Sequence, residues 1–67
     1  MKIDERKLKL ELARKCMNTT ELSRAAGIHR RTVWRIMQGE SASTVVVGKI
    51  AQALGVDILD IIEWKKI

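Results

Sequence analysis

A chain of 67 residues has room for one small domain, and its apolar fraction of 46% is that of an ordinary globular protein. Thirteen Lys and Arg against eight Asp and Glu give a formal net charge of +5, which favours an anionic partner, although solubility alone is an alternative reason for it. The single cysteine excludes an internal disulfide, and Cys16 with His29 supplies too few ligands for a metal site of the zinc type.

Hydropathy indicates no membrane partner. No apolar run approaches the roughly 20 residues of a membrane span, and the charged segment 1–6 lacks the apolar core of a signal peptide. The absence of proline and the many straight-chain residues favour helices over sheet. We therefore expect a single all-α domain over residues 1–67, located in the bacterial cytoplasm or nucleoid.

Two helices with clear start signals are predicted first. Asp4 can cap a first helix that ends at 16–17, with Leu8 and Leu12 toward the core, Glu11 outside and Leu10 off the apolar stripe. The pattern from Asn18 to Glu21 is a capping box for a second helix over 19–26, which Gly27 ends. The expected buried side of the second helix consists of Leu22, Ala25 and Ala26.

A third helix over 30–38 follows after only two residues, Ile28 and His29, so 19–38 is expected to form a helix-turn-helix. Its packing side consists of Thr32, Val33, Ile36 and Met37, and its other side of Arg30, Arg31, Trp34, Arg35 and Gln38. Cations near a helix N-terminus oppose the helix dipole. Such an unfavourable placement indicates function, and we expect this helix to enter a DNA groove; a merely solvated face is the alternative.

A fourth helix is expected to start at Ser43 or Thr44 and to end at Leu54, before Gly55. The β-branched run 45–47 also allows a strand. The helical spacing of the residues that follow favours the helix. That apolar stripe consists of Val47, Ile50, Ala51 and Leu54.

A fifth helix is expected from Asp57, with Asp60 three residues later in a capping-box pattern. The segment carries more apolar residues than one face of a short helix can bury, so part of the set is expected on a partner surface. The residues assigned to that surface are Ile58, Ile61, Ile62, Trp64 and Ile67. The alternative is a tail that folds back over Leu8 and Leu10.

The helix-turn-helix together with the segment 50–56 resembles the Cro/C1-type (Xre) family of transcriptional regulators. The residues that carry the resemblance are Leu22-Ser23, Ala26-Gly27-Ile28, Val33, Ile36, Gln38-Gly39 and Ile50-Ala51-Gln52-Ala53-Leu54-Gly55-Val56. The resemblance extends over roughly residues 4 to 62. It implies a compact five-helix, lambda-repressor-like DNA-binding domain.

The resemblance also implies roles for individual residues. Those expected to contact bases are Arg30, Arg31, Trp34 and Arg35, and those expected to contact the DNA backbone are Asn18, Thr19, Thr20, His29 and Gln38. Arg30 is open to either role, and His29 to being only a surface residue. For Trp34 the alternatives are a thymine methyl group, a sugar, cation–π support of an arginine, or packing against the following loop.

Three departures from the family pattern stand out, and one of them is His29, rather than Ser or Thr, at the N-cap of the third helix. Many relatives bury an Arg–Glu pair at positions that match Leu12 and Met37, so apolar packing is expected here instead. The loop 40–43 also lacks the basic residues that some relatives direct at phosphate, and Glu40 would repel it.

The predicted function is sequence-specific transcriptional regulation, with the helix 30–38 in the major groove and repression by occupancy of an operator. Because one such helix contacts few base pairs, a homodimer is expected, at least on double-stranded DNA. The alternative is an antitoxin-like module that binds a protein partner as well as its own operator. No catalytic set of residues or phosphate-binding loop is present, so neither an enzyme nor a cofactor is expected. RNA binding is disfavoured because no aromatic stacking platform exists.

Overall fold

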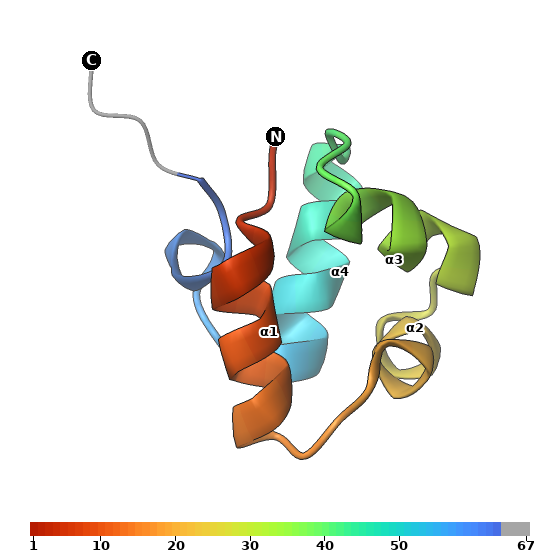
Figure 1. The fold of residues 1–67 in the computed structure, drawn as a ribbon, viewed down its shortest axis with the longest axis vertical. Coiled ribbons are helices and arrows are strands. Elements are labelled where there is room, and N and C mark those ends of the chain that lie inside the picture. The colour runs from red at the N-terminus through yellow and green to blue at the C-terminus, as the bar shows by residue number, and fades with distance from the viewer. Residues whose placement is uncertain (64–67) are drawn as a thin grey trace.

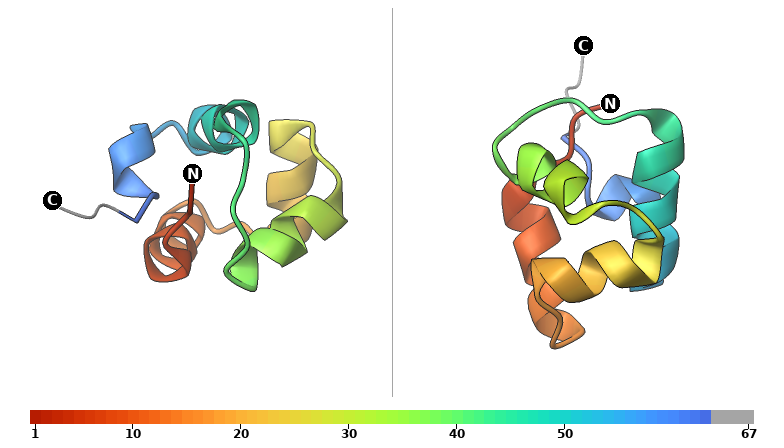
Figure 2. Two further views of the ribbon diagram at one scale, coloured as in Figure 1. Left: turned by 90° about the horizontal axis from the view of Figure 1, so that it is seen from above. Right: turned by 90° about the vertical axis from the view of Figure 1, so that its right-hand side faces the viewer.

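The computed structural model describes residues 1–63, which form four α-helices and one short 3₁₀ turn (Figure 1). In chain order these elements are α1 (Glu5–Arg14), α2 (Thr19–Ala26), α3 (Arg30–Met37), α4 (Thr44–Leu54) and η1 (Ile58–Asp60). α4 lies between η1 and the α2–α3 pair, as Figures 1 and 2 both show. No helix of residues 1–63 has the length and apolarity needed to cross a bilayer.

Each element begins at a residue whose side chain accepts a hydrogen bond from the first turn, which satisfies an otherwise free backbone N–H. These caps are Asp4, Asn18, His29, Ser43 and Asp57. The capping box of α2 is complete, because the N–H of Glu21 donates to Asn18 Oδ1 at 2.8 Å and Glu21 Oε1 accepts from the Asn18 N–H at 3.0 Å. The predicted starts of all four helices are therefore confirmed.

The predicted fifth helix is wrong. The segment after Asp57 makes only the single 3₁₀ turn of η1 and then becomes extended, with Ile62 bridged antiparallel to Ile3. The N–H of Asp4 donates to the Ile61 carbonyl oxygen at 2.8 Å, and the N–H of Glu63 donates to that of Lys2 at 2.9 Å. Pairing with the N-terminal segment supplies the backbone hydrogen bonds that a longer helix would have made internally.

The N-terminal segment also holds the loop that follows α3. The Met1 ammonium donates to the Ala42 carbonyl oxygen at 2.9 Å, and the N–H of Ala42 donates to the Met1 carbonyl oxygen at 2.7 Å. Ile3, which the sequence pattern did not place in the core, has only 2% of its surface exposed. Residues 1–3 therefore connect this loop to the last described segment of the chain.

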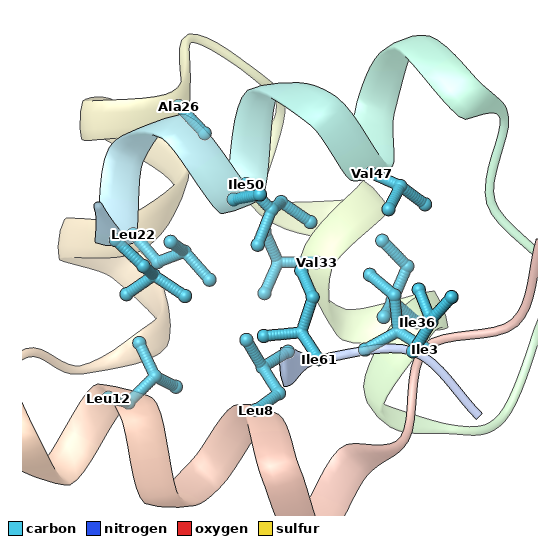
Figure 3. Packing of buried hydrophobic residues seen from close by; sticks show 13 residues of the cluster. Ile3, Leu8, Leu12, Leu22, Ala26, Val33, Ile36, Val47, Ile50 and Ile61 are labelled. Carbon is cyan, nitrogen blue, oxygen red and sulfur yellow. The ribbon is translucent and has the colours of Figure 1, made fainter. Parts of the chain in front are cut away.

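The core receives side chains from every helix and from both extended ends (Figure 3). Its members are Ile3, Leu8, Leu12, Leu22, Ala26, Val33, Ile36, Val47, Ile50, Ala51, Leu54, Ile61 and Ile62. Met37 packs partly buried against this cluster, which includes Leu12, so the apolar packing expected at these two positions is present.

Two of the burial predictions are wrong. Glu11 was placed outside but is buried, because it lies three residues from Leu8 on the inner edge of α1. In α2 the third buried residue is Ser23 rather than Ala25, and its hydroxyl donates to the Thr20 carbonyl oxygen at 2.7 Å.

Candidate nucleic-acid interface

The turn between α2 and α3 fixes how the two helices meet. Gly27 has φ +69°, a left-handed conformation that glycine adopts without steric cost. The N–H of Gly27 donates to the Arg24 carbonyl oxygen at 3.2 Å, and the N–H of Ile28 donates to the Ser23 carbonyl oxygen at 3.0 Å. Because Ser23 and Ala26 are small and buried, the helices approach closely at a steep angle (Figure 2). The predicted helix-turn-helix is therefore present.

α3 has the two faces that its sequence predicts. Val33 and Ile36 are buried in the core, and Thr32 and Met37 are half-buried beside them. The exposed residues are Arg30, Arg31, Trp34, Arg35 and the C-cap Gln38. The arginines and Trp34 thus share one solvent-facing surface, which we call the arginine face (Arg30, Arg31, Trp34 and Arg35).

The arginine face is not neutralised by carboxylates within residues 1–63. The ion pairs in that part of the chain join Lys2 to Glu63 and Arg14 to Glu11, and neither pair includes a residue of α3. The first turn of α3 contains no acidic residue, and its cap is His29, whose Nδ1 accepts from the Arg31 N–H at 3.0 Å. The positive charge at the start of α3 is therefore available to an anion.

The starts of α2 and α3 border one open hollow. It is lined by Thr19, Thr20, His29, Arg30, Arg31 and Trp34, and we call it the α2–α3 hollow. Hydroxyl and cationic groups on exposed side chains suit phosphate, while the indole of Trp34 adds an apolar wall. Three of the residues expected to contact the DNA backbone, Thr19, Thr20 and His29, thus lie beside three residues of the arginine face.

Two of the expected backbone contacts lie outside that hollow. Asn18 Oδ1 accepts the hydrogen bond that caps α2, so this oxygen is occupied within the fold. Gln38 caps the other end of α3 and borders a different hollow, in which carboxylates outnumber the cations. The charged residues of that second hollow are Lys2, Asp4, Glu5, Arg6 and Glu63.

The assignment of the partner surface needs correction. Ile61 and Ile62 are 0% and 6% exposed, because their extended segment enters the core, so they cannot meet a partner. Ile58 is half-buried, whereas Trp64 and Ile67 lie outside the described residues. Val45 and Leu59 were not assigned to this surface from the sequence, although they are 64% and 55% exposed. An apolar residue off the stripe of its own element was the signal that could have found them.

Comparison with known proteins places the chain in a family. The family model described as the Cro/C1-type HTH DNA-binding domain matches residues 7–66. No curated protein and no solved structure was found to match the sequence. Since the matched residues make up most of the chain and include the helix-turn-helix, the protein belongs to the family of Cro/C1-type helix-turn-helix DNA-binding domains.

Proposed function

We propose that this protein is a sequence-specific transcriptional regulator that represses by occupying an operator, with α3 in the major groove. The observation that carries the proposal is the exposed arginine face, which lacks acidic partners among residues 1–63. Arg31 and Arg35 are one turn apart and suit two guanines, since arginine binds guanine O6 and N7 with both of its terminal nitrogens. Such a regulator acts in the cytoplasm, where its DNA is.

The backbone contacts follow from the α2–α3 hollow. Thr19, Thr20 and His29 are exposed beside the arginine face, where the phosphates that flank the groove would pass. Arg30 stands at the first position of α3 and suits either a base or one of these phosphates. Asn18 and Gln38 keep only a secondary role in the proposal, because both cap helices.

A homodimer on DNA completes the proposal. Recognition helices of dimeric regulators bind half-sites about 34 Å apart, so two copies would place their α3 helices in successive turns of the major groove. The exposed or half-buried apolar residues Val45, Ile58 and Leu59 are the candidates for the contact, and Trp64 and Ile67 stay predictions.

The alternative use of these apolar residues is to bind a different protein, as in an antitoxin-like module that also binds its own operator. The observation that favours it is the exposure of Val45 and Leu59, which lie on α4 and η1 rather than on α3. Purification of the tagged protein from its host distinguishes the two cases. A second small protein that stays bound after removal of DNA supports the alternative, whereas a lone chain supports the homodimer.

Selection of binding sites from random duplex DNA tests the proposal. Three proteins are compared: the wild type, the Arg31→Ala, Arg35→Ala variant, and an Arg6→Ala, Lys9→Ala variant that loses the same charge from exposed positions of α1. We expect the wild type and the α1 variant to enrich the same guanine-containing inverted repeat and the α3 variant to enrich none. Binding of all three to any duplex without enrichment would refute sequence-specific regulation.

Repression itself is tested by transcription in vitro from a promoter that overlaps the selected site. The wild type should lower the transcript and the α3 variant should not. A rise in transcript with the wild type would make the protein an activator instead.

A further inference from the structure

Trp34 is the least expected residue on the arginine face. Its side chain is 60% exposed, although the small core of this chain would gain from an indole. Its neighbours Val33 and Ile36 are buried, and they fix the rotation of α3 about its axis. Trp34 therefore cannot turn inward while α3 stays packed, and its apolar surface stays in water until something covers it.

The surroundings of Trp34 indicate what covers it. It borders the α2–α3 hollow together with Arg30 and Arg31, which precede it by four and three residues and so lie on the same side of α3. Guanidinium groups at those positions suit the hydrogen-bond acceptors of guanine. The group that covers the indole therefore lies next to a guanine contact, on the floor of the same groove.

The one apolar group that base pairs present in the major groove is a methyl group on C5 of a pyrimidine. Thymine carries it, and so does 5-methylcytosine. We propose that Trp34 packs on such a C5-methyl group beside a guanine bound by Arg30 or Arg31, and that Trp34 determines specificity at that base pair. This inference rests on the proposed function, because it places α3 in the major groove.

A cycle of protein and DNA changes tests the inference on the operator found by selection. Each thymine is replaced singly by deoxyuridine, which removes only the methyl group, and the affinities of wild type and Trp34→Ala are compared. The control is Leu10→Ala, which removes an equally exposed apolar side chain (61%) from α1. Thermal unfolding confirms that the three proteins fold alike.

At one position per half-site, we expect uracil to weaken the wild type by about fourfold, the value of one buried methyl group. The affinity of Leu10→Ala should fall by the same factor when thymine is replaced by uracil. Trp34→Ala should bind the thymine and uracil duplexes equally. If the selected sites carry cytosine, rather than thymine, at the base pair next to the guanine contact, replacing this cytosine by 5-methylcytosine should raise wild-type affinity by a similar factor. This second arm distinguishes 5-methylcytosine from thymine as the source of the methyl group.

Other outcomes would overturn the inference. If the wild type binds its operator specifically but responds to neither replacement, Trp34 contacts sugar or nothing, and the proposed function still stands. If replacing thymine by uracil weakens Trp34→Ala as much as it weakens the wild type, another residue makes the methyl contact. If no specific site can be selected, the proposed function fails, and this inference fails with it.

Discussion

His29 is the N-cap of α3, although histidine ranks below Ser, Asp and Asn as a helix cap. Its Nδ1 accepts a single hydrogen bond, from the Arg31 N–H at 3.0 Å. The two residues after it are arginines at the positive end of the helix dipole. The start of α3 is therefore poorly stabilised both by its cap and by its charges. The same features direct positive charge at the α2–α3 hollow, which is where we place the DNA backbone.

Replacing His29 separates these two effects. His29→Asp should raise the free energy of unfolding by about 1 kcal/mol, because aspartate caps better and complements the dipole. It should also weaken DNA binding by about fivefold, since a carboxylate about 4 Å from a phosphate costs about 1 kcal/mol in water. Thermal denaturation and binding to the selected operator measure the two effects.

His29→Asn is the matched control, because it supplies the better cap without the charge. It should stabilise the fold and leave DNA affinity closer to that of the wild type. Equal loss of affinity in both variants would show that the imidazole itself, rather than local charge, contacts DNA.

At the scale of elements, the local features of this fold were predictable and the distant ones were not. The capping box of α2 is contained in the four residues from Asn18 to Glu21, and the two faces of α3 follow from helical periodicity. The bridge from Ile3 to Ile62 joins opposite ends of the chain, and no local pattern encodes it. Glu11 was expected outside with the other charged residues of α1, although it follows Leu8 by three residues and is buried.

In the candidate site too, local features were predictable from the sequence and features that join distant segments were not. The arginine face was predictable because it lies on one helix. The α2–α3 hollow joins two helices, and the family resemblance, rather than periodicity, indicated its Thr19 and Thr20 side. The removal of Ile61 and Ile62 from the partner surface depended on the distant pairing with residues 1–3.

The residue Cys16, which follows the end of α1, has a strained backbone conformation that a substitution could relieve. Cys16 has φ +54°, a left-handed conformation that costs L-residues about 1–2 kcal/mol and glycine much less. Cys16→Gly should therefore raise the free energy of unfolding by about 0.5–1 kcal/mol, after allowance for the greater freedom of glycine in the unfolded chain. Chemical denaturation measures it. The control Lys15→Gly, at φ −91°, should destabilise instead; stabilisation by both would argue against relief of strain.

The N-terminal segment should contribute to stability through Ile3 rather than through its ion pair. Ile3→Ala should cost about 2–4 kcal/mol, as for other buried aliphatic truncations. Lys2→Ala should cost less than about 0.5 kcal/mol, because its 3.7 Å contact with Glu63 is exposed. Denaturant titration of both variants measures the difference. Similar losses from the two would show that the backbone pairing, and not the Ile3 side chain, holds the segment.

For the whole molecule, the proposed assembly predicts cooperative binding. The wild type should bind an inverted repeat more tightly per site than a single half-site. Leu59→Asp should remove this advantage, by roughly tenfold in affinity, because a charge would enter the apolar contact. Leu10→Asp on α1 is the control. Titrations of both duplexes measure it, and full cooperativity in Leu59→Asp would exclude the surface around η1 from the dimer contact.

The placement of α3 in the major groove is tested most directly by protection of guanine N7 from methylation. Guanine N7 lies on the major-groove edge, where Arg31 and Arg35 are placed. On the selected operator, the wild type should protect guanines in two groups about 10 base pairs apart, and the Arg31→Ala, Arg35→Ala variant should leave them reactive at a concentration that still binds the duplex. Wild-type protein that occupies the operator while every N7 stays reactive would contradict the account.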